Sequence, residues 1–133
     1  MTAIVVDTSA IIAILLEEDD AARLAAVIVE ADEVLISAAT VLEATLVALR
    51  LTGSASAIER FVVSQPLIVV PFDAEQLAIA QAGFERFGKA RHSAKLNFGD
   101  CFAYALAKSR GLPLLWKGDD FGQTDVVPAN PGP

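Results

Sequence analysis

The sequence predicts an α/β fold: a short parallel sheet of four to five strands with helices on both of its faces. Short segments that are apolar throughout indicate strands covered on both sides, because a strand with one solvated face would alternate instead. Segments with helix-capping signals separate these strands, and strict alternation of strand and helix is typical of a parallel sheet. The chain has 133 residues, which suits a single domain.

The first half of the chain carries capping signals at several predicted helix starts. Thr8 and Ser9 can cap the apolar segment that follows them, and Ser56 with Glu59 fits a capping box. Gly53 is placed to end the longest of these helices. The predicted elements are strand 4–6, helix 10–16, helix 21–31, strand 34–36, a helix from Ser37 or Thr40 to about Leu51, and helix 56–63.

Prolines and glycines set the boundaries in the second half. Pro66 and Pro71 enclose a third strand, and Asp73 opens a helix that ends near Gly88. Gly111 fits a helix C-cap. The remaining predicted elements are strand 67–70, helix 100–109, strand 114–116 and a short fifth strand at 125–127, so that one domain spans 1–127 and a loose tail spans 128–133.

Composition narrows the class of protein. Apolar residues make up 54% of the chain, which favours a well-filled core. The longest apolar runs are shorter than the ~20 residues of a membrane span, and the start of the chain lacks the basic segment of a signal peptide. The single cysteine, Cys101, excludes an internal disulfide and suits a reducing compartment. We therefore expect a cytoplasmic protein with no membrane partner.

The charge is unevenly distributed along the chain. The net charge is −7, with −10 in residues 1–85 and +3 in residues 86–133. The acidic total argues against a protein that coats DNA. The basic second half can still form a local phosphate-binding surface.

Carboxylates cluster where the predicted topology brings chain segments together. Asp7 follows the first strand, Glu43 lies in the helix after the second, Asp100 opens the helix that leads into the fourth, and Asp119 and Asp120 follow that strand. Ligand sites of open α/β sheets form at the carboxyl ends of the strands. Clustered carboxylates repel one another unless a cation neutralises them, and an all-oxygen ligand set favours Mg²⁺ or Mn²⁺ over Zn²⁺.

Each acid also has a purely structural interpretation. Asp7 and Asp100 can serve helix N-termini, Thr40 and Glu43 fit a capping box, and Asp119 and Asp120 suit a turn after a glycine. Four coincidences at one sheet edge are less plausible than one shared site.

Three motifs together resemble a PIN domain, and within that family the VapC-type toxins of bacterial toxin–antitoxin pairs. They are Val5-Val6-Asp7-Thr8-Ser9-Ala10, the segment Leu96-Asn97-Phe98-Gly99-Asp100-Cys101-Phe102-Ala103-Tyr104-Ala105-Leu106-Ala107, and Leu114-Leu115-Trp116-Lys117-Gly118-Asp119-Asp120-Phe121, with the helical Glu43 between the first two. The resemblance implies a three-layer α/β/α sandwich. It also implies a Mg²⁺-dependent endoribonuclease that acts on structured RNA such as tRNA, with Mn²⁺ as a possible substitute. The implied partners are a cognate antitoxin and a second copy of the chain, in a larger toxin–antitoxin assembly.

The resemblance also implies site residues. Asp7, Glu43 and Asp100 match the first three acids of the family, and we favour Asp119 over the adjacent Asp120 as the fourth. All five are candidate metal ligands, and the first three with Asp119 are the candidate catalytic residues. A metal-activated water would attack the phosphodiester in line.

Other polar residues have candidate supporting roles. Thr8 and Ser9 can orient the carboxylates or simply cap their helix. The basic segment after Arg86 is expected to contact the RNA backbone, although it could also be a solvated loop. Its members are Lys89, Arg91, His92 and Lys95. His92 could stack on a base or assist proton transfer, but a surface histidine without a role is favoured.

Two other function classes remain open at this point. A phosphoacceptor signalling domain also gathers aspartates at strand ends, but it needs an acceptor after the third strand, where this chain has Val70-Pro71. A catalytically inactive PIN-like binding module is the other, and the filled acidic positions argue against it. The apolar helices 10–16 and 40–51 exceed the needs of a small core, which suggests that they take part in an interface with a second copy or an antitoxin helix.

Overall fold

The fold is built on one four-stranded parallel sheet. We analysed a computed structural model, which describes residues 2–65, 67–89 and 92–129. The strand order is β3-β2-β1-β4, and each neighbouring pair is parallel. The strands are β1 (Ala3–Val6), β2 (Glu33–Ser37), β3 (Leu67–Val70) and β4 (Leu114–Leu115). The predicted parallel sheet is confirmed, with four strands.

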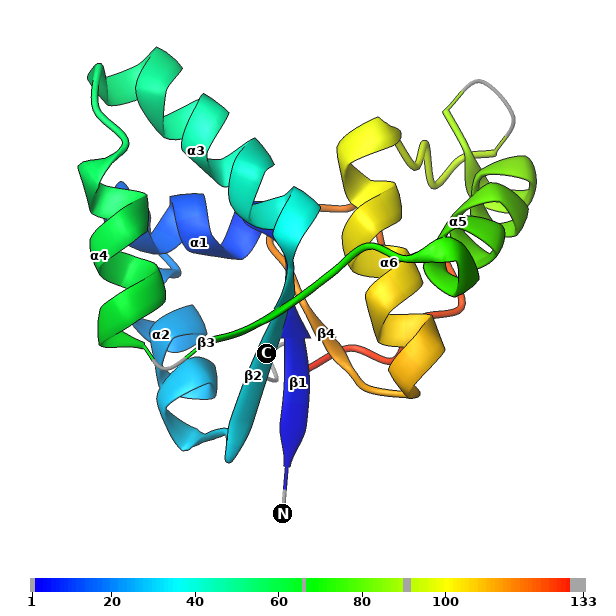
Figure 1. The fold of residues 1–133 in the computed structure, drawn as a ribbon, viewed down its shortest axis with the longest axis horizontal. Helices are drawn as coiled ribbons and strands as arrows, with labels where there is room; N and C mark the ends of the chain where they lie inside the picture. The colour runs from blue at the N-terminus through cyan, green and yellow to red at the C-terminus, as the bar shows by residue number, and fades with distance from the viewer. Residues whose placement is uncertain (1, 66, 90–91, 130–133) are drawn as a thin grey trace.

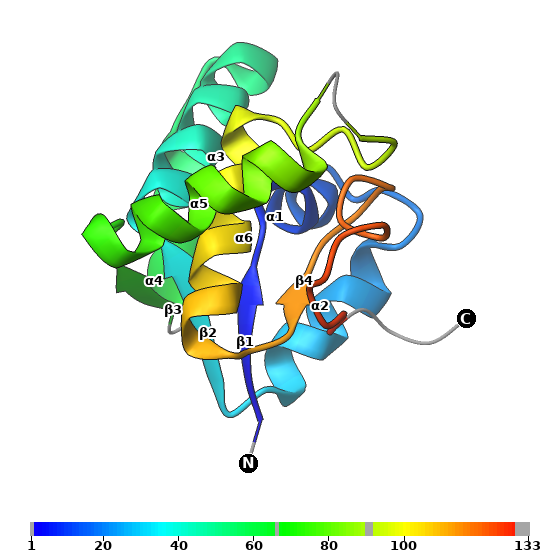
Figure 2. The same ribbon diagram turned by 90° about the vertical axis from the view of Figure 1, so that its right-hand side faces the viewer.

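Helices cover both faces of this sheet, so the predicted three-layer α/β/α architecture is confirmed. In Figure 1, α1, α2 and α4 lie on one side of the sheet, α5 and α6 lie on the other, and α3 rises from the carboxyl end of β2. Figure 2 shows α5 and α6 packed side by side in front of the strands. The helices are α1 (Thr8–Leu15), α2 (Ala21–Glu30), α3 (Ala38–Thr52), α4 (Ser56–Ser64), α5 (Ala74–Phe87) and α6 (Phe98–Arg110).

The sheet separates two hydrophobic cores. Successive strand residues point to opposite faces, so Val5 packs with α5 and α6, whereas Ile4 and Val6 pack with α1, α2 and α4. All three side chains are buried. This two-sided burial explains why β1 is apolar throughout, whereas the edge strand β3 leaves Ile68 and Val69 exposed.

Most predicted helix boundaries agree with the structure. Ser37 caps α3 and Asp73 caps α5, each through a side chain that accepts a backbone N–H. Gly53 and Gly111 end α3 and α6 in the left-handed conformation, which glycine adopts without a steric cost. Because the cap of α3 is Ser37, Thr40 lies inside the helix and does not form a capping box with Glu43.

Three predictions of local structure are wrong. Thr8 and Ser9 do not cap the first helix, because it begins at Thr8 and Asp7 is its N-cap. Ser56 is the first residue of α4 rather than its cap. The predicted fifth strand at 125–127 is reduced to an isolated parallel bridge between Leu114 and Pro128. The backbone N–H of Ala129 donates to Leu114, and residues 130–133 of the predicted tail lie outside the described residues.

The topology places four chain segments at one edge. β1 and β4 are adjacent parallel strands, so the residues that follow Val6 and Leu115 emerge together. α3 starts at the carboxyl end of the neighbouring strand β2, and α6 begins near the same edge of the sheet (Figure 1). Within the described residues, no helix is both long and apolar enough to cross a membrane.

Candidate active site

Asp7 lies at the centre of this edge, directly after β1. Its side chain is only 3% exposed, and its Oδ2 accepts hydrogen bonds from the Ser9 backbone N–H at 3.0 Å and from the Ser9 hydroxyl at 2.7 Å. Burial raises the pKa of Asp7 to about 6, against the lowering effect of the Ser9 hydrogen bonds, and Glu43 adds repulsion. The other oxygen, Oδ1, is buried and has no hydrogen-bond partner among the described residues.

Ser9 also connects Asp7 to the loop after β4. Its hydroxyl oxygen accepts the backbone N–H of Lys117 at 2.9 Å while it donates to Asp7. The Lys117 ammonium in turn contacts Glu18 and lies 3.1 Å from Asp20. Ser9 therefore fixes the Asp7 carboxylate to a segment more than 100 positions away in the chain.

Glu43 reaches the same edge from α3. Its Oε1 accepts a hydrogen bond of 2.5 Å from the Thr8 hydroxyl. Its Oε2 lies against the backbone of Gly99 in the first turn of α6, where a Cβ atom would come within 1.7 Å. The Thr8 hydroxyl therefore binds one oxygen of the Glu43 carboxylate, and the other oxygen occupies the space beside Gly99.

Asp100 is the buried acid of α6. Asn97 caps the helix and forms a capping box with Asp100, in which each side chain accepts the other residue's backbone N–H, at 2.9 and 3.0 Å. Burial raises the pKa of Asp100 to about 8, and repulsion from Asp7 and contact with Asp120 act in the same direction, opposed by the hydrogen bond from Asn97. The structural interpretation of Asp100 as a helix-terminal acid is therefore correct, and it is compatible with a place in the site.

The loop after β4 supplies the most exposed acids of the group. Asp119 and Asp120 are both exposed, and it is Asp120 that interacts with Asp100. Gly118, in the left-handed region at φ 105°, turns the chain, and its carbonyl accepts the Trp116 indole N–H at 2.9 Å. This arrangement favours Asp120 as the partner of the buried acids, whereas the sequence pattern favours Asp119.

The arrangement fits a divalent cation, although the carboxylates are not closed around one. Among the described residues, no three His, Cys, Asp or Glu side chains are near enough to hold a metal ion as they stand. The chemistry of the donors nevertheless suits one: Asp7 has a buried oxygen without a partner, and the pKa values of Asp7 and Asp100 are raised. Their hydrogen-bond donors, Ser9 and Asn97, are neutral and leave this negative charge without compensation.

The predicted RNA-binding segment is only partly covered by the structure. Lys89 and Lys95 are exposed, whereas Arg91 lies outside the described residues. His92 is half-buried: its Nδ1 accepts the Ala94 backbone N–H at 2.9 Å, and its ring packs edge-on against Phe87 at 5.2 Å. These contacts give His92 a structural role in shaping the loop.

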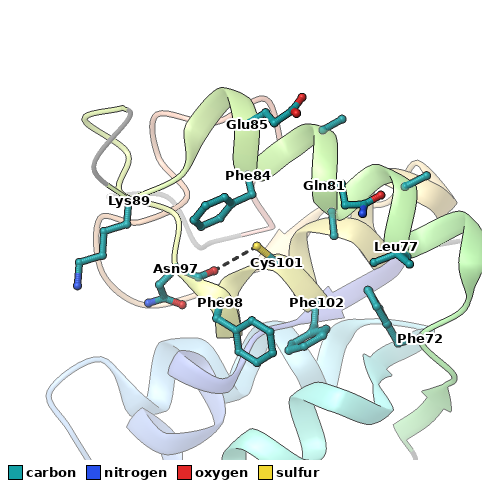
Figure 3. A pocket seen from close by; sticks show the side chains of 13 residues that line it. Phe72, Leu77, Gln81, Phe84, Glu85, Lys89, Asn97, Phe98, Cys101 and Phe102 are labelled. Carbon is teal, nitrogen blue, oxygen red and sulfur yellow. Dashed lines mark hydrogen bonds between the residues drawn. The ribbon is translucent and has the colours of Figure 1, made fainter.

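An apolar groove borders the site between α5 and α6. Its volume is about 880 Å³, and Figure 3 shows its aromatic side chains with Asn97 and Lys89 at one end. Phe98, two residues before Asp100, is 79% exposed. The main apolar lining residues are Phe72, Leu77, Phe84, Phe98, Cys101 and Phe102.

Sequence reasoning missed Asn97 and Gly99. Asn97 followed by Asp100 three residues later is a capping signal that can be recognised in the sequence alone. Gly99 within a helical segment is a weaker signal. A glycine inside a helix can mark a place where another group packs against the backbone, but the sequence does not say which group that is. Here that group is Glu43, which lies 56 positions earlier in the chain.

Comparison with known proteins identifies the family of the chain. The PIN domain family model matches residues 4–127. Ribonuclease VapC28 of Mycobacterium tuberculosis is 45% identical over 125 residues, covering 92% of this chain and 94% of that protein. A ribonuclease VapC of Mycolicibacterium smegmatis is 40% identical over 125 residues, covering 92% and 97% respectively.

Solved structures share the fold. VapC20 of Mycobacterium tuberculosis, described as a toxin that cleaves the sarcin–ricin loop, superposes with a TM-score of 0.76 at 20% identity and covers 96% of this chain and 99% of that one. A DNA-bound VapBC of Salmonella typhimurium superposes with a TM-score of 0.67 at 18% identity, covering 96% of each chain. These matches do not favour the phosphoacceptor alternative. The chain belongs to the PIN-domain family, and within it to the VapC ribonucleases of toxin–antitoxin systems.

Proposed function

We propose that this chain is an endoribonuclease toxin that hydrolyses RNA phosphodiesters with Mg²⁺ or Mn²⁺ at Asp7, Glu43, Asp100 and the Asp119–Asp120 loop. The observation that supports the metal most directly is the state of the two buried acids. Asp7 keeps one buried oxygen without a partner, and the pKa values of Asp7 and Asp100 are raised to about 6 and about 8. A divalent cation would stabilise the charged form of both.

The chain's own residues would prepare this site before a cation arrives. Ser9 orients one oxygen of Asp7 while the other has no partner among the described residues, and the Asn97 backbone N–H orients one oxygen of Asp100. Thr8 holds Glu43 beside them. When bound, the cation supplies Lewis-acid activation of water and offsets charge on the reacting phosphate.

Asp120 is the better-supported fourth carboxylate of the site. It is exposed, yet it interacts with Asp100 across the opening of the cluster. An exposed acid on a loop can move toward a cation at little cost, whereas the buried acids are fixed by their hydrogen bonds. Asp119 then acts as a turn residue or as a more distant ligand.

RNA would approach across the basic segment beside the site. Lys89 and Lys95 expose ammonium groups near the start of α6, and Arg91 and His92 belong to the same segment. Lysine and arginine side chains pair with phosphates independently of sequence, so this segment would supply affinity rather than specificity. The substrate class we propose is a structured RNA such as tRNA.

The direct test is cleavage of RNA by the wild type and by Asp7→Asn, with Mg²⁺ and with excess chelator. We expect cleavage by the wild type with Mg²⁺ alone, and its loss in the variant. A folded Asp7→Asn protein that cleaves as the wild type does, or cleavage that persists in chelator, would contradict the proposal. Sequencing of RNA ends after expression in cells would identify the target.

We also propose two protein partners, an antitoxin and a second copy of the chain. Solved structures with the same fold include toxin–antitoxin complexes, among them one from Klebsiella pneumoniae with a TM-score of 0.69 at 18% identity, over 92% of this chain and 93% of that one. Apolar surface is available for such contacts. α3 exposes Leu42, Leu46 and Leu49 along its length, and the groove of Figure 3 is open.

Charge substitution on α3 tests whether that surface is used. Leu46→Lys should weaken self-association or antitoxin binding, and Val63→Lys on α4, where Val63 is 83% exposed, serves as the matched control. Light scattering after gel filtration measures both assemblies. If Leu46→Lys leaves both intact, α3 is not the contact surface.

A further inference from the structure

A close approach between α3 and α6 occurs at Gly99. The Oε2 atom of Glu43 lies so near the backbone of Gly99 that a Cβ atom there would be 1.7 Å from it, and the carboxylate carbon would be 2.5 Å away. Both distances are far below any van der Waals contact. The space that Gly99 leaves empty is therefore filled by the Glu43 carboxylate.

Glycine is otherwise an unfavourable residue at this position. Gly99 is in the first turn of α6, and its backbone is not in the left-handed region that favours glycine. Alanine stabilises a helix relative to glycine, so local structure alone would favour alanine here. The adjacent Phe98 shows that bulk is accepted where the side chain points outward, since it is 79% exposed.

We propose that Gly99 is a positioning residue for catalysis: it forms a slot over the start of α6 that receives Glu43 and sets its distance from Asp100. The Thr8 hydroxyl holds the other oxygen of Glu43 at 2.5 Å, so the carboxylate is fixed from both sides. The N-terminus of a helix also favours a negatively charged group. This inference rests on the proposed metal-dependent function, because Glu43 has a catalytic role only there.

The slot explains how two distant segments keep a fixed separation. Glu43 extends from α3, and Asp100 directly follows Gly99. A side chain at residue 99 would push Glu43 away from Asp100 or push α6 away from α3. Either movement would separate two of the proposed metal ligands.

The test is a double-substitution cycle at residues 99 and 43. Gly99→Ala introduces the clash, and Glu43→Asp shortens the acid by one methylene and so vacates part of the slot. The cycle comprises the wild type, each single variant and the pair. Gly122→Ala is the matched control, because a Cβ atom there would meet only the Asp119 carbonyl oxygen at 3.7 Å, an ordinary contact.

Three measurements are made on each protein: the thermal midpoint, the affinity for Mn²⁺ alone by calorimetry, and RNA cleavage with Mg²⁺. We expect Gly99→Ala to lower the thermal midpoint despite the gain in helix propensity, to weaken Mn²⁺ binding at least tenfold, and to reduce cleavage. In the Glu43→Asp background, we expect the same alanine to raise the midpoint and to cause little further loss of Mn²⁺ affinity. Gly122→Ala should match the wild type in all three measurements.

The outcomes separate the slot from the proposed function. If Gly99→Ala acts identically on Mn²⁺ affinity and on the midpoint in both backgrounds, the two positions are independent and the slot is refuted. If the midpoints couple but the wild type neither binds Mn²⁺ nor cleaves RNA, the contact is structural and the proposed function fails. If Gly99→Ala retains wild-type Mn²⁺ affinity and cleavage, Gly99 is not a positioning residue.

Discussion

Asp100 lies in the first turn of α6 and Asp125 packs against the same helix, but the groups around the two carboxylates are of opposite character. Asp125, in the loop after β4, accepts a hydrogen bond of 2.7 Å from the Tyr104 hydroxyl and has Lys108 at 3.3 Å and Arg86 at 3.7 Å. Partial burial raises the pKa of Asp125, but the hydrogen bonds from Tyr104 and Lys108 outweigh it, and the pKa falls below its usual range.

Asp100 has the reverse balance. Burial is the largest influence, and the charged groups that act on it are the carboxylates of Asp7 and Asp120, so its pKa rises to about 8. Its compensating hydrogen bond comes from the neutral Asn97 backbone. Lys108 and Arg86 therefore offset the charge of Asp125, whereas the charged groups that act on Asp100 are carboxylates.

The comparison shows how a structural acid differs from a site acid. An acid that stabilises the fold is surrounded by lysine and arginine, as Asp125 is. A cluster of buried acids without such partners costs free energy unless a cation comes from solution, and perturbed pKa values of this kind concentrate at functional sites.

The largest expected effect is on RNA cleavage by Asp100→Asn. Loss of this charge should reduce the rate on the order of 10² to 10³-fold, as removal of a group that stabilises the transition state does. Asp125→Asn should cleave at nearly the wild-type rate. A cleavage assay with Mg²⁺ in excess measures both, and equal losses in the two variants would contradict the distinction.

A smaller effect should separate Asp120 from Asp119. Asp119 and Asp120 are both exposed, but only Asp120 interacts with Asp100. We therefore expect Asp120→Asn to reduce cleavage about 10- to 100-fold, in the range seen when a supporting partner of a metal site is removed. Asp119→Asn should lose less. The reverse order would restore the assignment that the sequence motif favours.

The pH dependence of stability gives a third contrast. The pKa of Asp7 rises from 3.8 to about 6 on folding, so above pH 4 the native state binds more protons than the unfolded state. Stability of the metal-free protein should therefore fall as the pH rises from about 4 toward 8, by roughly 3 kcal/mol from Asp7 alone, and Asp100, whose pKa rises to about 8, adds a loss of the same sign. Urea unfolding at several pH values measures this slope.

Two controls sharpen the pH experiment. Asp7→Asn removes one of the two titrating acids and should reduce the slope, with Asp100 supplying the remainder, and added Mg²⁺ should stabilise the wild type most at high pH, where the acids are ionised. Asp125→Asn should leave this part of the slope unchanged. Stability that increased between pH 5 and pH 8 without metal would mean that the buried acids are compensated by the protein itself.

The smallest effect concerns the structural acid. Tyr104→Phe removes the hydrogen bond to Asp125 and should lower the free energy of unfolding by about 1 kcal/mol, since Tyr104 is buried and the lost bond is to a charged group. RNA cleavage should not change at saturating Mg²⁺. Urea unfolding and the cleavage assay, run on the same preparation, check both halves of this prediction.

Local chemistry made much of the fold predictable. Apolar runs marked the four strands, and Ser37, Asp73, Gly53 and Gly111 marked helix ends, because caps and left-handed glycines act within a few residues of themselves. The error at Thr8 arose because Asp7, Thr8 and Ser9 can all accept an N–H, whereas α4 begins after Ala55, which makes no side-chain cap hydrogen bond. The predicted fifth strand failed because the segment after Asp125 pairs with β4 only at Pro128.

The sequence by itself determined the α/β class and the parallel sheet, and it predicted that Asp7, Glu43, Asp100 and the Asp119–Asp120 pair gather at one edge. Periodicity and strand polarity are properties of short segments, so they can be deduced without coordinates. Only the tertiary structure decided that Asp120 contacts Asp100, that Ser9 connects Asp7 to Lys117, and that Gly99 makes room for Glu43. Each of these contacts joins residues from different segments of the chain, and their distances depend on how the strands and helices pack.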